Sequence, residues 1–146
     1  MIDPLCLVKL EAAMEWKDEY AVGIKEIDAQ HKELISLFSR VTDAVAQSLP
    51  WSDIHFRVLE VKNFAAFHFE FEEALMRLFG YPQTDDHSNG HKQFVAKMNE
   101  IEKSSIADDV KQEVVTFLVK WLFDHILKSD RAYAQYILAG ASVARS

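Results

Sequence analysis

The stretch HFEFEEALMRLFGYPQTDDHSNGH, residues 68–91, decides how this chain folds. It closes one long helical pattern at the Gly-Tyr-Pro turn of residues 80–82, because glycine and proline interrupt helices. A second pattern starts directly afterwards, where Thr84 or Asp85 can cap a helix by accepting hydrogen bonds from free backbone N–H groups. Helices joined by so short a turn are expected to be antiparallel neighbours.

Apolar residues spaced alternately four and three apart extend this pattern through most of the chain. They predict four helices, within residues 27–45, 54–79, 84–101 and 108–137. Only four glycines and three prolines are present, which argues against a turn-rich β sandwich or barrel. The sequence therefore predicts an all-α fold, an antiparallel up-down-up-down four-helix bundle.

The length of the chain sets the number of domains. A chain of 146 residues and 16.8 kDa has room for one compact core, so we expect a single domain over residues 1–146. The segment before Ile24 has no clear helical period. We expect this N-terminal non-periodic arm to cover one end of the bundle with Trp16, Tyr20 and Val22.

Charge and cysteine content restrict the partners and the compartment. Sixteen basic and 23 acidic residues give a net charge of -7, the wrong sign for a protein that holds phosphate backbones, so no nucleic acid partner is expected. The single Cys6 cannot form a disulfide within the chain, which favours the reducing cytoplasm. Residues 1–16 contain no basic leader region and no apolar stretch of membrane-spanning length, so we expect neither secretion nor a membrane anchor.

The positions of the histidines are the informative feature of this sequence. Five of the six, together with one glutamate, fall on the predicted buried seams, whereas His55 lies off the seam and is expected to be exposed. Burying these groups without partners would cost several kcal/mol each, so they need a compensating ligand. A metal cluster inside the bundle would supply one. The seam residues are His31, His68, Glu72, His87, His91 and His125.

The spacing of these residues supports a shared site. His68 and Glu72 are separated by three residues, and so are His87 and His91. Each pair therefore lies about one helical turn apart on one face of its helix. Because His31 and the histidine at position 125 come from the other two helices, every helix is expected to contribute at least one ligand.

Asp130 does not fit the helical period. It follows His125 by five residues, which rotates it by roughly 140° on an ideal helix at about 100° per residue. If Asp130 is a ligand, the fourth helix should carry a one-residue π-bulge or another distortion between Leu127 and Asp130. The local sequence equally permits a solvated acidic residue beside Lys128 and Arg131.

The number and type of donors restrict the metal. Five imidazoles with one or two carboxylates are too many for one structural zinc, which takes four ligands, and too rich in nitrogen for calcium or magnesium. Two first-row ions that share carboxylates and a solvent-derived bridge would use the whole set. Iron suits imidazole and carboxylate together, while manganese and zinc stay open.

Four motifs in this chain resemble those of the hemerythrin family in its bacterial form. Their combination is highly specific, because the spaced candidate ligands occur together with flanking aromatic residues. The resemblance covers roughly residues 16–137, which we expect to form the core of a hemerythrin-like domain. The motifs are W-x3-Y-x-V-G-I-x2-I-D-x-Q-H at 16–31, H-F-x2-E-E at 68–73, G-Y-P-x4-H-x3-H-x2-F at 80–94 and W-L-x2-H-I-x3-D-x2-Y at 121–133.

The resemblance implies a non-haem di-iron centre that binds dioxygen reversibly, for oxygen storage, transport or delivery. One iron would be held by three histidines and the other by two, which leaves a coordination position open for dioxygen on the second iron. Glu72 and Asp130 would bridge the two irons together with an oxo or hydroxo group. The implied ligands are His87, His91 and His125 for the first iron, and His31 and His68 for the second.

Residues next to the candidate ligands suggest supporting roles. Four bulky apolar side chains could keep water and acids away from bound dioxygen, and each could equally be an ordinary core residue. Asp28 could orient a histidine ring or cap a turn. Gly90 weakens its helix and would ease the close approach of a neighbouring helix. The four apolar residues are Phe69, Trp121, Leu122 and Ile126.

Three functions are compatible with such a centre. We expect an oxygen-binding protein rather than an enzyme, with dioxygen and an oxygen-consuming client protein as partners. The alternatives are a module that senses oxygen or nitric oxide, and a di-iron oxidase or peroxidase. An enzyme would need a proton donor and a substrate channel near the open iron, and the sequence identifies neither.

Overall fold

The computed structural model describes residues 14–104 and 108–145. A short 3-10 helix, η1, precedes the long helices, and α5, η2 and α6 follow one another without a gap to form one continuous rod. The segment η2 is a π-helix. The elements are η1 (Asp18–Tyr20), α2 (Lys25–Ala46), α3 (Trp51–Leu78), α4 (Thr84–Lys103), α5 (Asp108–Trp121), η2 (Leu122–Asp130) and α6 (Arg131–Arg145).

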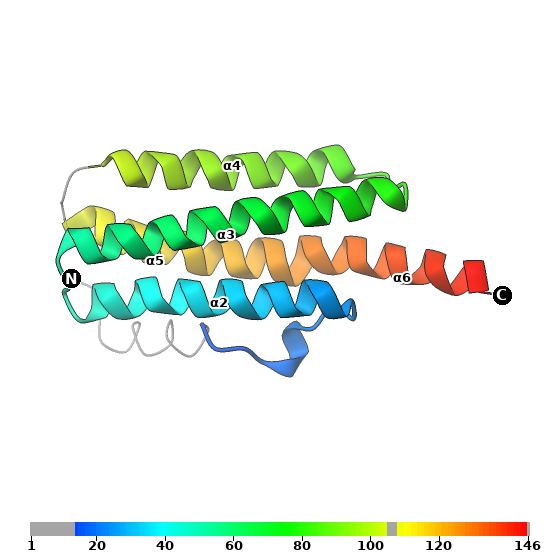
Figure 1. The fold of residues 1–146 in the computed structure, drawn as a ribbon, viewed down its shortest axis with the longest axis horizontal. Helices are drawn as coiled ribbons and strands as arrows, with labels where there is room; N and C mark the ends of the chain where they lie inside the picture. Colours follow the sequence, from blue (N-terminus) through cyan, green and yellow to red (C-terminus); the bar gives the residue numbers. More distant parts are fainter. Residues whose placement is uncertain (1–13, 105–107, 146) are drawn as a thin grey trace.

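Helices α2, α3 and α4 and the rod of α5, η2 and α6 form an antiparallel four-helix bundle, so the predicted fold class is confirmed (Figure 1). Helix α3 packs against both α2 and α4, and α5 packs against α2 and α4. Each helix ends in a turn at residues 47–50 and 79–83, where the chain reverses direction. The links between the helices are therefore short. The long rod extends past residue 137, where the sequence analysis ended the core, to Arg145.

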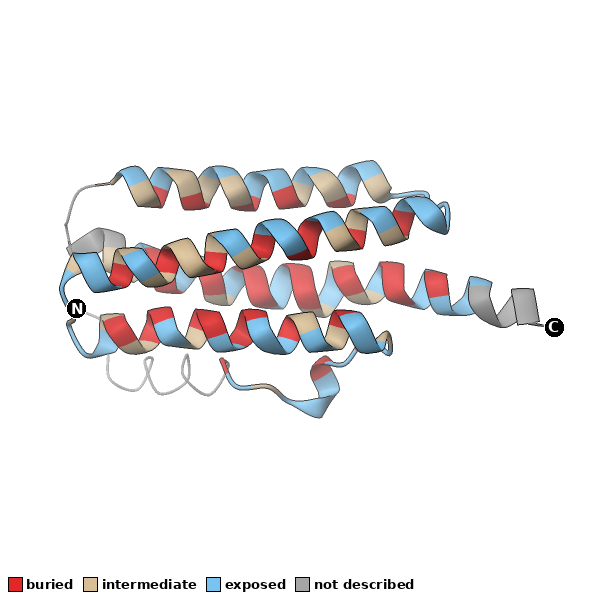
Figure 2. Ribbon diagram, in the orientation of Figure 1, coloured by how far each residue is buried: buried red, intermediate tan, exposed pale blue. Residues whose placement is uncertain are grey.

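The interior of the bundle consists of two apolar clusters with the histidines between them. Buried residues face the interior on every rod, as the red bands in Figure 2 show. The larger cluster includes Phe69, whose ring stacks on His91. The smaller cluster includes Tyr133, whose ring meets His87 edge to face. The polar site is therefore enclosed by packed side chains on both sides along the bundle axis.

The cap predicted for the third helix is wrong. Thr84 is the first residue of α4, and the position before it is occupied by Gln83, which makes no capping hydrogen bond through its side chain. The Thr84 hydroxyl instead donates to the backbone carbonyl of Tyr81 at 2.6 Å. Asp85 lies one residue further inside the helix. The hydroxyl thus closes the tight turn rather than satisfying the first backbone N–H groups of the helix.

The described part of the N-terminal arm, residues 14–23, packs on the bundle as predicted, although it lies along the side of α2 rather than only across an end (Figure 1). Tyr20 and Val22 are buried, and Trp16 meets Tyr20 edge to face with ring centroids 5.9 Å apart. Asp28 accepts hydrogen bonds from the backbone N–H groups of Val22 at 2.7 Å and Gly23 at 3.3 Å. Asp28 therefore caps the turn that leads into α2. A φ of +94° at this turn requires glycine at position 23.

His55 is not fully exposed: its side chain is 35% exposed, and its ring stacks on Trp51 with centroids 6.1 Å apart. Cys6 lies outside the described residues. Within the described part of the chain, every helix is too short or too polar to cross a membrane.

Candidate metal centre

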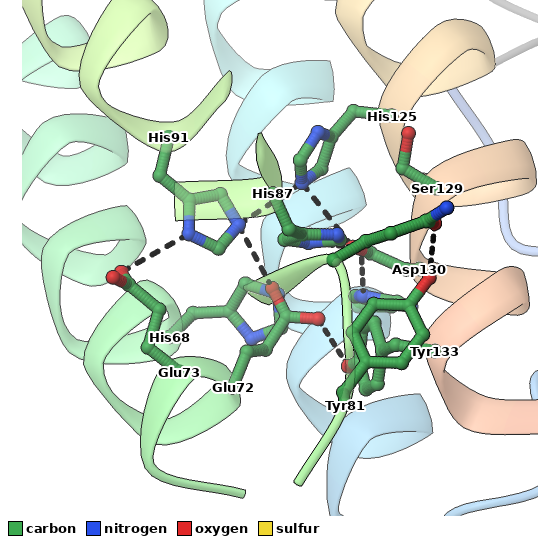
Figure 3. Close-up of polar contacts among 12 residues, drawn as sticks. His68, Glu72, Glu73, Tyr81, His87, His91, His125, Ser129, Asp130 and Tyr133 are labelled. Carbon is green, nitrogen blue, oxygen red and sulfur yellow. Dashed lines mark hydrogen bonds and ion pairs between the residues drawn. The ribbon is translucent and has the colours of Figure 1, made fainter. Parts of the chain in front are cut away.

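All seven candidate ligands predicted from the sequence come together in the middle of the bundle. Figure 3 labels all of them except His31. Each rod contributes, because the seam positions of an amphipathic helix face the same interior. All seven residues are buried, with exposed fractions of 7% or less. They are His31 from α2, His68 and Glu72 from α3, His87 and His91 from α4, and His125 and Asp130 from η2.

The ligating atoms fall into two overlapping groups, each compact enough to surround one metal ion. Within each group these atoms lie within 4.8 Å of one another. Glu72 and Asp130 belong to both groups, so each carboxylate lies between the two sets of imidazoles. The first group adds His87, His91 and His125, and the second adds His31 and His68.

The shared position of Asp130 follows from its distances. One carboxylate oxygen, Oδ2, lies 3.0 Å from Nε2 of His31. The other, Oδ1, lies 2.8 Å from Nε2 of His87 and 3.2 Å from Nε2 of His125. A carboxylate whose two oxygens face different groups of imidazoles has the geometry of a bridge.

Glu72 occupies the corresponding place on the opposite side. Its Oε1 lies 2.9 Å from Nε2 of His68 and 3.4 Å from Nε2 of His91, so a single oxygen approaches both groups. The other oxygen, Oε2, accepts a hydrogen bond from the hydroxyl of Tyr133. The bond fixes the rotation of the carboxylate, because the tyrosine ring is itself completely buried.

The π-helix explains how Asp130 reaches the cluster. The distortion predicted between Leu127 and Asp130 is confirmed, but it is longer, since η2 covers Leu122–Asp130. In a π-helix, residues five apart lie on the same face, whereas in an α-helix they do not. His125 and Asp130 can therefore face the same site.

The unsatisfied atoms of the donor set show that it fits metal ions. Six buried ligand atoms facing the site approach one another at ion-pair distance without forming a hydrogen bond to any described residue. They are Nε2 of His31, His68 and His87, Oε1 of Glu72, and both carboxylate oxygens of Asp130. Buried polar atoms are almost always satisfied in native proteins. In addition, Nε2 of His91 and Nε2 of His125 face each other at 3.0 Å. Cations between these atoms would satisfy all of them, so the residues present fit a pair of metal ions.

The outer nitrogens of two imidazoles have partners that fix the state of the ring. Nδ1 of His91 donates to the carboxylate Oε2 of Glu73 at 3.2 Å, and Nδ1 of His68 donates to the amide Oε1 of Gln30 at 2.7 Å. Because the acceptor oxygens carry no proton, Nδ1 holds the ring hydrogen and Nε2 presents its lone pair to the site. The Ser88 hydroxyl donates to Glu73 Oε1 at 2.5 Å and holds this carboxylate in place.

Sequence reasoning assigned no role to Gln30, Glu73 or Tyr133. All three lie within the quoted motifs, next to ligands or one turn beyond them. The signal that could have found them is the need of every buried imidazole or carboxylate for a partner on its outer side. Which residue meets that need depends on how the helices rotate against each other, and this is visible only in the fold.

The electrostatics of the site favour ionised carboxylates. Burial by itself raises the pKa of the Glu72 carboxyl, but His68 and His91 hold that pKa at about 2. Burial has the same effect on Asp130, yet His125, His31 and His87 keep the pKa of this carboxyl well below its ordinary value. Burial lowers the pKa of His31, but Asp130, Glu72 and Asp28 together raise it above its usual value. The site therefore presents two negative charges to a cation.

Apolar side chains cover the imidazoles. Phe69 stacks on His91 with ring centroids 3.9 Å apart, and Trp121 stacks on His125 at 4.5 Å. These two rings and the side chains of Leu122 and Ile126 are buried. A methyl group at Gly90 would lie 3.5 Å from Cε1 and Nδ1 of His125, an ordinary van der Waals distance, so the packing of this ring against α4 does not require glycine there.

Comparison with known proteins agrees with this geometry. The family model described as hemerythrin HHE cation binding domain matches residues 22–137, which is most of the chain. The chain belongs to the hemerythrin family. The two shared carboxylates and five imidazoles of the candidate centre lie within this hemerythrin domain.

Relatives of the hemerythrin domain match along most of their length. A bacteriohemerythrin of Stenotrophomonas maltophilia is 34% identical over 88% of this chain and 84% of the relative. A bacteriohemerythrin of Clostridium acetobutylicum is 31% identical over 81% of this chain and 96% of the relative. One from Pseudomonas aeruginosa is 31% identical over 86% and 82%, respectively.

Solved structures support the fold of the hemerythrin domain. A crystal structure of a hemerythrin mutant, in which tyrosine replaces a leucine, superposes with a TM-score of 0.69, covering 84% of this chain and 95% of the other. A structure described as that of a leucine-to-phenylalanine mutant reaches 0.72 with the same coverage. Identity to both is 22%, so these likenesses bear on the fold alone.

Proposed function

We propose that this chain is a di-iron protein that binds dioxygen reversibly, for oxygen storage, transport or delivery. The observation that carries the proposal is the pair of donor groups that share Glu72 and Asp130. Membership of the hemerythrin family and the relatives named bacteriohemerythrin support it. When bound, two iron ions would supply the electrons and the open coordination position for dioxygen.

We assign a different role to each half of the site, because the two donor groups contain different numbers of imidazoles. His87, His91 and His125 would hold one iron, and His31 and His68 the other. With the two carboxylates shared, the first half has one imidazole more than the second. The half with two imidazoles therefore keeps room for an external ligand, and we assign dioxygen to it.

The surrounding residues would protect bound dioxygen. Phe69 borders the half to which dioxygen is assigned, since its ring centroid lies 6.0 Å from that of His68. The stacking of Phe69 on His91 and of Trp121 on His125 covers the three-imidazole half. Leu122 and Ile126 are completely buried and come from the same π-helix as His125. Dioxygen is apolar, whereas its reduced forms are stabilised by protons, so an apolar wall favours release of dioxygen over release of peroxide.

The binding of dioxygen is tested by optical spectroscopy. The iron-loaded, reduced protein mixed with oxygen should develop a visible charge-transfer band that disappears on removal of oxygen, without hydrogen peroxide in solution. Rapid oxidation that cannot be reversed and is coupled to turnover of a substrate would instead indicate an enzyme.

Partners and location are part of the same proposal. An oxygen-consuming client protein in the reducing cytoplasm would suit a carrier, and the single Cys6 is compatible with that compartment. Cell fractionation followed by detection of the chain would check the compartment. Recovery from the membrane or periplasmic fraction would contradict it.

A further inference from the structure

Three tyrosines form a chain of neighbouring rings from the metal-ligand cluster to the surface. Tyr133 is fully buried, and its hydroxyl donates to Glu72 Oε2 (Figure 3). Its ring centroid lies 6.3 Å from that of Tyr81, which lies 5.3 Å from that of Tyr136. Tyr81 is half-buried, and Tyr136 is 42% exposed. Exposure therefore rises with each step away from the cluster.

Each hydroxyl in this chain has an acceptor, and the middle ring borders a cavity. Tyr81 donates to Gln83 Oε1 at 3.1 Å, and Tyr136 donates to the carbonyl oxygen of Gly80 at 3.3 Å. Tyrosine loses its hydroxyl proton when it loses an electron, so its oxidation needs a proton acceptor such as these oxygens or nearby water. Tyr81 also lines an open cavity of about 330 Å³. The other lining residues are Gln83, Asp86, His87, Lys128, Ser129 and Ala132.

Trp121 is the other residue beside the candidate ligands that could be oxidised in place of Tyr133. Its ring stacks on His125, with centroids 4.5 Å apart and planes 14° apart. Its other ring contacts among the described residues are phenylalanines, which are much harder to oxidise than tyrosine or tryptophan. An oxidised Trp121 would therefore have no easily oxidised aromatic neighbour toward the surface, whereas an oxidised Tyr133 would. The phenylalanines are Phe38, Phe69 and Phe94.

We propose that Tyr133, Tyr81 and Tyr136 form a relay that carries oxidising equivalents from the metal centre to the surface. The relay would act when hydrogen peroxide reacts at the centre, and a small thiol in solution would reduce its outer end. It protects the buried ligands, because damage would otherwise accumulate on the side chains that hold the metals. The inference rests on the proposed function, since it requires the loaded centre.

The steps balance in electrons and protons. Tyr133 passes one electron toward the centre, its O–H bond breaks, and the proton moves along the hydrogen bond to Glu72. Tyr81 then reduces Tyr133, which takes its proton back, while the proton of Tyr81 leaves to water in the cavity. Tyr136 reduces Tyr81 in the same way, and a thiol returns an electron and a proton to Tyr136. The proton of Tyr136 leaves to solvent, and the centre takes up one proton from solvent in each cycle. Two such cycles therefore convert one hydrogen peroxide and two thiols into two waters and one disulfide.

The relay is tested by trapping radicals on the iron-loaded full chain. The protein is treated with hydrogen peroxide, without thiol, in the presence of a nitroso spin trap, and the adducts are located by peptide mass spectrometry. In the unmodified chain, adducts are expected on Tyr136 and Tyr81. Tyr136→Phe should leave adducts on Tyr81 only. Tyr81→Phe should abolish adducts on Tyr136, because the middle step is lost.

Tyr20 provides a matched control, since it is the fourth tyrosine of the chain and lies outside the relay. Tyr20→Phe should leave the adduct pattern unchanged. Adducts on Tyr136 that persist in Tyr81→Phe would overturn the relay, and so would adducts concentrated on Trp121. Added thiol should suppress the adducts in the unmodified chain.

The failure of the relay and the failure of the proposed function have different signatures. Iron content and the reversible oxygen band are measured on each sample before peroxide is added. A chain without two irons, or without the reversible band, refutes the proposed function and removes the basis of the relay. A chain with both, yet without adducts on Tyr81 and Tyr136, refutes the relay alone.

Discussion

At the scale of single residues, the partners of the imidazoles differ in charge. His91 donates to a carboxylate, Glu73, and His68 donates to an amide, Gln30, whereas Nδ1 of His31 is buried with no hydrogen-bond partner in the described chain. A negatively charged acceptor makes an imidazole a stronger donor to a metal. His91, in the three-imidazole half, is therefore expected to be a stronger donor than His68 or His31.

The two shared carboxylates are expected to be necessary for a complete metal pair. Glu72→Ala or Asp130→Ala should lose at least one iron per chain, because each carboxylate belongs to both donor groups. Elemental analysis of the purified variants measures this. Glu70→Ala removes an exposed carboxylate from the same helix as Glu72 and should retain both irons. Full occupancy by two irons in the Glu72 and Asp130 variants would contradict the bridging assignment.

Glu73 is expected to act by holding the ring of His91. Glu73→Ala should weaken binding of the metal at the three-imidazole half by about 10- to 100-fold, the usual cost of losing a partner behind a histidine ligand. Glu73→Gln keeps an acceptor oxygen and should recover most of the affinity. Titration with a competing chelator gives the affinities. Equal affinities for the Ala and Gln variants would show that the hydrogen bond does not matter.

At the scale of the element, one inserted residue determines which side chains face the interior in the rod formed by α5, η2 and α6. The π-helix accommodates this residue between Leu122 and Asp130 and keeps both His125 and Asp130 on the interior face. The helix remains intact on both sides, so the cost of the insertion is confined to η2. This local irregularity coincides with the functional site.

A single deletion is expected to distinguish the π-helix from the α-helix around it. Removal of the exposed Lys128 would place Asp130 four positions after His125 instead of five. An α-helix places residues four apart on one face. We expect this variant to be α-helical there and to retain two irons, as measured by elemental analysis and a crystal structure.

Deletion of Lys120 in α5 is the matched control. It removes one residue where the helix is already regular, so every later side chain rotates by about 100° relative to the residues before it. His125 would leave the site, and the three-imidazole half should lose its iron. Equal iron content in the two deletion variants would contradict the account of η2.

At the scale of the whole molecule, the bundle encloses charged groups that compensate one another only in part without metal. The five imidazoles and two carboxylates lie between two apolar clusters that bury the remaining interior. Bound metal ions stabilise the folded state alone, so metal binding and folding are coupled. The metal-free protein is therefore expected to melt at a lower temperature than the loaded one.

The metal-free protein should be most stable in mildly acidic solution. The pKa of Glu72 is held at about 2, below its usual 4.5, so its contribution to stability is lost as the pH falls from 4.5 toward 2. The pKa of His31 is raised above 6.5, so its contribution is lost as the pH rises above 6.5. Thermal melting of the metal-free chain across this range measures both limbs.

A Glu72→Gln variant isolates the acidic limb of this profile. It removes the carboxyl whose pKa is lowered, so its melting temperature should fall less between pH 4.5 and 2 than that of the unmodified metal-free chain. The alkaline limb should remain, because His31 keeps its contact with Asp130. Identical acidic limbs in the two proteins would show that Glu72 does not contribute.

The sequence by itself determined the four helices and the set of candidate ligands. Periodic apolar residues and the Gly-Tyr-Pro break at 80–82 indicated where the rods begin and end. Histidines on the seams indicated a buried polar site, because such groups are seldom buried without a partner. Even the distortion near Asp130 followed from a spacing of five residues. These features are local, since each depends on residues within a few helical turns.

Only the tertiary structure decided how the rods rotate and approach one another. The contacts of Gln30 and Glu73 with the imidazoles, and the tyrosine chain, join residues far apart in the sequence. The role of Thr84 in the turn was also beyond sequence reasoning, because a hydroxyl can donate as well as accept. Helical period specifies which residues face the interior, while packing between helices specifies which of them meet.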